Sequence, residues 1–137
     1  MRLILSILVS FVIAGCSTTP IKIEAAKPIP SVHIYNDKYI NHEEGNEKVT
    51  IIRDQGFTGS GCSHTIFIDN DKAFDIQAGQ AIVVSLKPGN HFFRLDLGAG
   101  LCPNESYSQS TYLALGGPQT FRISISSNMN IMLTRIN

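Results

Sequence analysis

The stretch Gly59-Ser60-Gly61-Cys62-Ser63-His64 holds the residue types of a catalytic nucleophile and its base. Serine hydrolases of the α/β class place the nucleophile in a Gly-x-Ser-x-Gly turn between a strand and a helix, where a histidine removes the hydroxyl proton. Here the glycine spacing differs, and the residues that follow have strand-like rather than helical periodicity. We therefore interpret residues 54–63 as a flexible Gly/Ser loop.

His64 and Asp69 flank the same short predicted strand, at its opposite ends. That separation is too large for a hydrogen-bonded catalytic dyad. We expect His64 to be solvated, and we expect Asp69 to lie in a turn where its carboxylate caps backbone amides.

The residues that could bind a metal ion or act as a pair of catalytic carboxylates also lack the spacing that these functions need. The histidines show no i, i+2 or i, i+4 pairing: His33, His42, His64 and His91. One predicted hairpin carries aspartates without the longer ligand series and terminal Glu of a calcium loop: Asp69, Asp71 and Asp75. A polar loop carries glutamates that do not converge on a cleft: Glu43, Glu44 and Glu47. The sequence predicts no metal, no cofactor and no enzymatic activity.

The chain has 137 residues, with 11 Lys+Arg and 11 Asp+Glu, so its formal net charge is zero with histidine neutral. Charged residues make up only 16% of it. A balanced, sparsely charged chain does not attract polyanions by bulk electrostatics, which argues against nucleic acid as a partner. The length fits a single domain.

The N-terminus has the organisation of a bacterial export signal. Arg2 supplies a positive region, and residues 3–14 form an apolar run that is shorter than the roughly 20 residues of a membrane-spanning helix. The run ends in Ile13-Ala14-Gly15-Cys16, which resembles the lipobox of bacterial lipoproteins. The resemblance implies a signal peptide at 1–15 and lipidation of Cys16 by a diacylglyceryl thioether and an amide-linked acyl chain. The alternative is an ordinary secretory signal with an incidental cysteine.

Residue 17 is Ser rather than Asp, which in enterobacterial lipoproteins implies export to the outer membrane. We therefore expect a lipid-anchored protein of the outer membrane that faces the periplasm. Residues 16–30 contain prolines, which remove amide donors and favour extended, solvated backbone: Pro20, Pro28 and Pro30. We predict that this segment is a tether, with the alternative that Ile21 and Ile23 add an edge strand.

Residues 31–137 have the pattern of a β domain, because β-branched and aromatic residues alternate with polar ones and turn residues recur every eight to twelve positions. The predicted strands cover 32–35, 49–53, 64–68, 73–77, 80–86, 91–97, 111–115, 120–126 and 131–136. No segment sustains a period near 3.6, so little or no helix is expected. The predicted fold is all-β: a β-sandwich or small barrel of about seven or eight mostly antiparallel strands.

Cys62 and Cys102 remain as an even pair once Cys16 is lipidated, and the periplasm is oxidising. We predict one disulfide between them. The four intervening strands run up and down, so both cysteines return to one end. In one flat sheet, the first and fourth of these strands would be about 14 Å apart, beyond the roughly 7 Å limit for bridged Cα atoms. The sheet must therefore fold over itself, which favours a sandwich or barrel.

Two segments form a further pattern, Ile66-Phe67-Ile68-Asp69-Asn70 and Ser85-Leu86-Lys87-Pro88-Gly89-Asn90-His91-Phe92, with Gly79 between them. The pattern resembles the PEGA-like β-domain of a family of small bacterial lipoproteins of unknown function, in which an apolar strand ends in Asp-Gly or Asp-Asn and Leu-x-Pro-Gly-x-His follows. The similarity covers residues 48–97. It implies an extracytoplasmic all-β domain that binds or scaffolds, and it transfers no catalytic residue.

Aromatic residues in or beside loops form the predicted contact surface: Phe57, Tyr107 and Tyr112. The predicted disulfide ties loops 54–63 and 98–108 into one end, where we expect a partner to bind. The sequence therefore predicts an outer-membrane-anchored periplasmic lipoprotein that is a non-catalytic binding or structural module, an accessory of an envelope assembly. Its expected partners are the membrane, through the lipid, and an envelope protein. The alternative is a lipoprotein inhibitor of a lysozyme-like enzyme.

Overall fold

The computed structural model describes residues 17–56, 59–98 and 102–137. The predicted signal peptide, the lipidation site Cys16 and the contact residue Phe57 lie outside the described residues.

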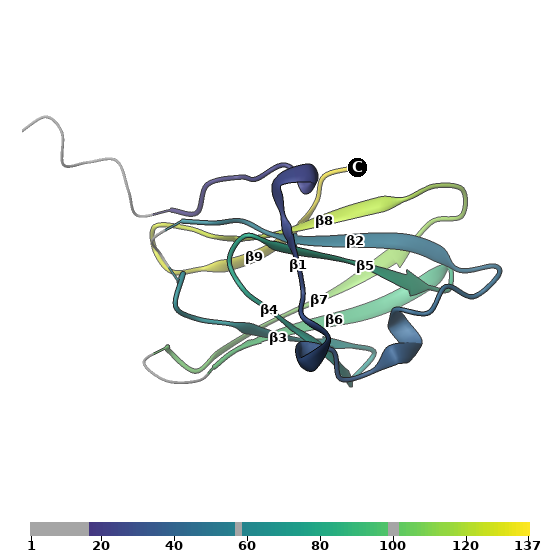
Figure 1. The fold of residues 1–137 in the computed structure, drawn as a ribbon, viewed down its shortest axis with the longest axis horizontal. Helices are drawn as coiled ribbons and strands as arrows, with labels where there is room; N and C mark the ends of the chain where they lie inside the picture. Colours follow the sequence, from purple (N-terminus) through teal and green to yellow (C-terminus); the bar gives the residue numbers. More distant parts are fainter. Residues whose placement is uncertain (1–16, 57–58, 99–101) are drawn as a thin grey trace, which may run out of the picture.

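The described residues form two stacked β-sheets (Figure 1). The first sheet has the strand order β1 (Lys27–Pro28), β5 (Gln80–Leu86), β2 (Glu47–Arg53), β8 (Gln119–Ile125) and β9 (Ile131–Arg135). The second has the order β4 (Asp71–Ile76), β3 (His64–Ile68), β6 (Gly89–Leu97) and β7 (Glu105–Leu113). Only β1 with β5 and β2 with β8 pair in parallel among these strands. The predicted all-β fold is confirmed as a sandwich, with the two-residue β1 as an additional strand.

The core lies between the sheets because the strands alternate apolar and polar residues. In β8, Phe121, Ile123 and Ile125 are buried, while the residues between them are half-buried on the opposite face. Phe93 of β6 packs against Phe121, with ring centroids 5.7 Å apart. Burial of each such side chain contributes about 1.5–3 kcal/mol, so this alternation drives the two sheets together.

The disulfide forms where the sequence places it. β3 and β6 are neighbours in the second sheet, whereas β5, which lies between them in the chain, belongs to the first sheet. His64 pairs with Leu97, so the segments before β3 and after β6 meet at one end. Cys62 and Cys102 are bonded there, with Cα atoms 5.9 Å apart. The chain does fold from one sheet to the other between the cysteines, as the disulfide argument required.

Strand β7 differs from its prediction, because it begins at Glu105 whereas the predicted strand covered 111–115. Its sequence is polar on both faces, and Leu113 is its only buried residue. Nine residue pairs with β6 hold it in the ladder. An edge strand can rely on these backbone bonds alone, so it needs no apolar alternation.

The helical content consists of single turns. The described residues contain three 3-10 turns: η2 (Ile23–Ala25), η3 (Ser31–His33) and η4 (Asp37–Tyr39). The predicted strand at 32–35 is wrong, because η3 occupies its first half and only Ile34 forms a β-bridge, with Phe74. None of the described helices is long and apolar enough to span a membrane.

Residues 17–40, which we call the strap, are hydrogen-bonded to the sandwich. The amide of Thr18 donates to the carbonyl oxygen of Ile125 at 3.0 Å, and Thr19 forms an antiparallel bridge with Gln55. β1 then adds to the edge of β5. The strap therefore crosses from one end of the first sheet to its edge (Figure 1).

The prediction of a solvated tether is wrong for residues 17–30. Ile21 and Ile29 are each only 8% exposed, and Ile29 belongs to the central core. The edge strand forms at Lys27–Pro28, while Ile23 begins a 3-10 turn, so the alternative strand at Ile21 and Ile23 is also misplaced. An edge strand tolerates proline because half of its amides need no partner in the sheet.

Ile29→Ala is expected to lower the free energy of unfolding by about 2–4 kcal/mol, since it leaves a cavity in the core. Val32→Ala is the matched control, because Val32 is 76% exposed and its truncation should cost almost nothing. Urea denaturation of the oxidised protein measures both. Equal, small effects would show that the strap is solvated after all.

Candidate functional site

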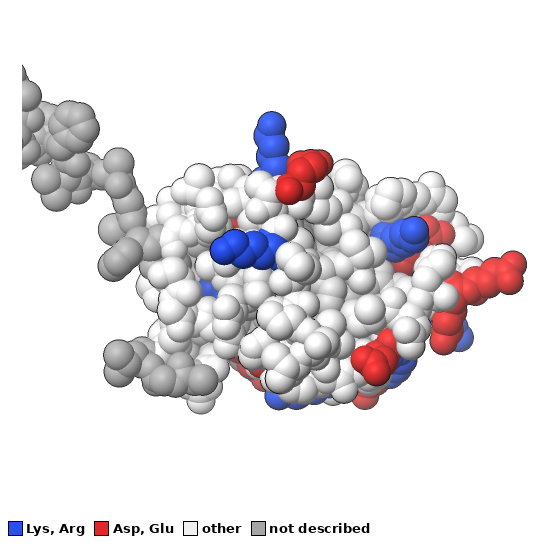
Figure 2. Space-filling model, in the orientation of Figure 1, with Lys and Arg blue, Asp and Glu red and all other residues white. Residues whose placement is uncertain are grey.

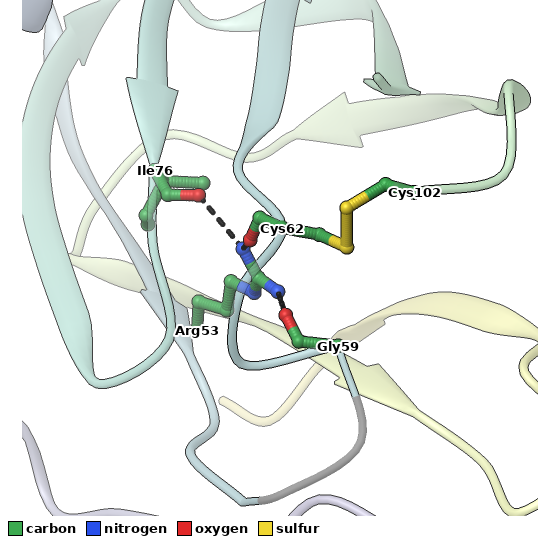
Figure 3. Close-up of a disulfide and its surroundings, with 5 residues drawn as sticks. All are labelled: Arg53, Gly59, Cys62, Ile76 and Cys102. Atoms are coloured by element: carbon green, nitrogen blue, oxygen red, sulfur yellow. Dashed lines mark hydrogen bonds between the residues drawn. A yellow bond between two sulfur atoms is a disulfide. The ribbon is translucent and has the colours of Figure 1, made fainter. Parts of the chain in front are cut away.

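Arg53 is a buried cation at the disulfide end of the sandwich. It ends β2 on the same inward face as Val49 and Ile51 and is only 1% exposed. Its Nη1 donates to the carbonyl oxygens of Cys62 at 2.6 Å and Ile76 at 2.9 Å. Its Nη2 donates to the carbonyl oxygen of Gly59 at 2.7 Å (Figure 3). Burial lowers the pKa of Arg53 to about 10, so the guanidinium stays charged at neutral pH.

His64 lies at the start of β3 and has no exposed surface. Neither ring nitrogen has a hydrogen-bond partner among the described residues. Burial, and in second place the charge of Arg53, lower the pKa of His64 to about 3. The expectation of a solvated histidine is therefore wrong, because the alternation of β3 places His64 inward beside Ile66 and Ile68.

A disulfide and the hydrogen bonds of Arg53 join the elements at this end of the molecule. β3 follows the Gly/Ser loop, so the strand-to-helix turn of a nucleophile elbow is not formed. Neither nitrogen of the His64 imidazole has a hydrogen-bond partner among the described residues. No described carboxylate therefore orients the ring as a general base would require. The disulfide closes a separation of 40 residues, which by chain entropy stabilises the fold by about 4 kcal/mol.

Asp69 and His91 form a second polar constellation at the opposite end, and we call it the hairpin staple. Asp69 lies in the β3–β4 turn with φ of 51°, and its Oδ1 accepts from the amide of Phe92 at 2.9 Å. Its Oδ2 lies 2.7 Å from Nδ1 of His91, while Nε2 of His91 lies 2.7 Å from the carbonyl oxygen of Lys87. The predicted amide-capping role of Asp69 is confirmed. Both ring nitrogens of His91 face acceptors, so its side chain links the β3–β4 turn to the β5–β6 turn.

The two aspartates of β4 hold the strap instead of converging with Asp69. Asp71 pairs with Lys38, and this contact lowers the pKa of Asp71. Asp75 accepts from the hydroxyls of Tyr35 at 2.5 Å and Thr65 at 2.7 Å. The carboxylates therefore have separate partners, and the described residues contain no group of three or more His, Cys, Asp or Glu that could hold a metal ion.

Two surface clefts accompany these contacts. A polar cleft of about 330 Å³ lies beside the hairpin staple and includes Lys38, Ser85 and Lys87. An apolar cleft of about 390 Å³ lies between the strap and β5 and includes Ile23 and Val83. The polar cleft also holds His91 and Asp69, whose side chains bind each other.

The structure does not gather the predicted aromatic contact surface at one end. Tyr107 is half-buried against the core, and its hydroxyl donates to Oε1 of Gln109 at 2.8 Å. Tyr112 is 61% exposed, but it lies near the far end of β7, about 17 Å along the strand from Tyr107. The alternation of β7 turns the side chain of Tyr107 towards the core, and its part in a contact surface stays a prediction. Tyr112 remains an exposed candidate.

Sequence reasoning missed Arg53, although a usable pattern was present. Val49, Ile51 and Arg53 alternate on one face of a strand, and strict alternation places the arginine inside. The carbonyl acceptors could not be found from side-chain types, because backbone oxygens are present at every position.

The fold and these contacts together define a disulfide-braced β-sandwich whose polar side chains join its turns and sheets. Comparisons of the chain with protein-family models, curated proteins and solved structures give no match. The function must therefore be argued from the chain's own residues.

His64→Leu is expected to reduce the acid sensitivity of the fold. The pKa of His64 lies near 3 in the folded chain, below the ordinary 6.5, so between these values the unfolded chain binds a proton that the folded chain does not. The free energy of unfolding therefore rises with pH, by up to about 1.4 kcal/mol per pH unit. This stabilising contribution of His64 is lost as the pH falls from about 6.5 towards about 4. Urea midpoints across this range should show a shallower slope for His64→Leu than for the wild type.

The control for this measurement is His42→Gln, which changes an exposed loop histidine and should keep the wild-type slope. A His64→Leu slope equal to that of the wild type would contradict a neutral, buried imidazole.

Proposed function

We propose that the chain is a lipoprotein anchored in the outer membrane through Cys16 and facing the periplasm, and that its sandwich is a non-catalytic binding or structural module of an envelope assembly. One observation carries the proposal. Thr18 and Thr19, which follow the lipobox-like sequence within a few residues, make backbone hydrogen bonds with the sandwich. Cleavage before Cys16 would leave the whole described fold and place its N-terminus at the lipid.

The polar contacts support a non-catalytic role. The histidine of the hairpin staple binds an aspartate and a carbonyl oxygen, and the other buried histidine lies beside a cation. Catalysis requires titratable groups that are free to exchange protons with a substrate. The PEGA-like resemblance supports the same class of function, since its Pro-Gly-x-His residues lie at the hairpin staple.

The open edge of β7 supports a binding role. Among the described strands, β7 pairs only with β6, and Nη2 of Arg135 donates to the carbonyl oxygen of Tyr112 at 2.5 Å. After Glu105 the strand has no charge and no proline. Such an edge can accept an extended segment of another protein by backbone pairing, and proteins otherwise protect long edges of this kind.

Cys16→Ala is expected to release the protein from the membrane, because it removes the acyl chains that supply about 0.8 kcal/mol per buried methylene. Cell fractionation of the full-length protein, with separation of inner and outer membranes, measures the change. The wild type should be found with the outer membrane, and Ser17→Ala is the matched control that keeps the acylated cysteine. Persistence of Cys16→Ala in the membrane fraction would refute the anchor.

A photoreactive phenylalanine analogue at Tyr112 is expected to form a discrete adduct with one envelope protein in intact cells. The same analogue at Val32, which is 76% exposed on the strap, is the control and should give an adduct several times weaker. Immunoblotting and mass spectrometry measure the two adducts. Equal adducts from both positions, or none from Tyr112, would overturn β7 as the contact edge.

A further inference from the structure

The first docked residues lie at the same end of the sandwich as the disulfide. Thr18 binds the backbone of Ile125, the last residue of β8, and Thr19 binds Gln55, just after β2 ends. Cys16 is only two residues from Thr18, a reach of at most about 7 Å. A lipid on Cys16 therefore has to lie close to this end. The segment between Cys16 and Thr18 is too short to let the domain rotate away from the membrane.

This end, which we call the uncharged end, consists of residues 17–20 and the described residues of four loops: 54–56 with 59–63, 77–79, 98 with 102–104, and 126–130. Their sequences contain one charged residue, Asp54. Asp54 is 1% exposed and is paired with Arg122, so it is not presented to a surface. Exposed charges border these loops. Glu105 begins β7, Lys22 follows Pro20 by two residues, and the amide of Lys27 donates to the carbonyl oxygen of Gly79 at 2.9 Å.

The opposite end carries many charges. Its turns and the adjoining strand ends contain the acids Asp37, Glu43, Glu44, Glu47, Asp69 and Asp71, and the bases Lys38, Lys48, Lys72, Lys87 and Arg135. Acids outnumber bases there by one. In Figure 2 most of the coloured side chains lie towards the right of the view, whereas the described surface at the left shows few.

We propose that the uncharged end lies against the membrane surface, with the acidic end directed away from it. This inference rests on the proposed lipidation of Cys16. An uncharged polar surface can approach the headgroups without the desolvation cost that exposed charges would incur. The acidic end would be repelled by anionic headgroups, so charge and chain length favour the same orientation.

The orientation is tested with full-length protein in vesicles of phosphatidylethanolamine and phosphatidylglycerol that contain an energy-acceptor lipid. Asn128→Cys at the uncharged end and Asn41→Cys at the acidic end each provide one exposed thiol for a donor dye. The two positions are about 30 Å apart along the strands. We expect energy transfer to be at least several-fold greater from position 128. Equal transfer, or greater transfer from position 41, in membrane-bound protein would overturn the orientation.

A spacer provides the matched control. Insertion of about 20 Gly/Ser residues between Ser17 and Thr18 gives a flexible reach of about 25 Å and should abolish most of the difference between the two positions. An unchanged difference would show that the short connection does not set the orientation. Failure of the unmodified protein to bind the vesicles would instead refute the lipid anchor, so the two proposals fail by different observations.

Discussion

The guanidinium of Arg53 is the interaction on which the disulfide end of the sandwich depends. Arg53 belongs to the first sheet, while two of its acceptors, the carbonyls of Ile76 and Cys62, belong to the second sheet and the loop that enters it. A buried cation is costly unless its donors are satisfied. The loop must keep its carbonyl oxygens in place, and the two sheets are therefore joined by hydrogen bonds as well as by apolar packing.

The same constraint explains the chemistry of its neighbours. His64 lies inside the same end, where the positive charge of Arg53 disfavours a second cation, so the imidazole stays neutral. The disulfide then fixes the loop whose carbonyl oxygens Arg53 needs (Figure 3). Glycine and serine dominate that loop and offer little apolar surface for packing. A covalent bond and a buried guanidinium thus provide the order that a larger apolar cluster provides elsewhere.

The sequence predicted those parts of the fold that apolar alternation or covalent chemistry determines. The alternation of Phe121, Ile123 and Ile125 predicts β8, and the cysteine pair predicts a sheet that folds over itself. The alternation pattern does not predict the first residues of β7, because an edge strand needs no apolar face. The proline content of the strap predicts a solvated tether, but Ile21 and Ile29 are buried against the sandwich.

The candidate site was harder to predict because it depends on contacts between distant turns. The Pro-Gly-x-His pattern was recognised as a pattern, but its physical role depends on Asp69, whose carboxylate bridges His91 and a backbone amide across two hairpins. Tyr107 and Tyr112 differ by an odd number of positions, so one strand sends them to opposite faces. Tyr112 is exposed for this reason, whereas Tyr107 is half-buried.

The uncharged end, the acidic end and the open edge of β7 are three separate parts of the surface. The strands run along the axis between the uncharged end and the acidic end, so β7 starts near the former and finishes near the latter. With the uncharged end at the membrane, the nine residues of β7 would extend about 30 Å away from it. The strap binds β4 and adds β1 to β5, which covers edges on its side of the sandwich. In the proposed orientation β7 would stand upright from the membrane, and β7 and β9, each paired on one side only among the described strands, are the edges that a partner could reach.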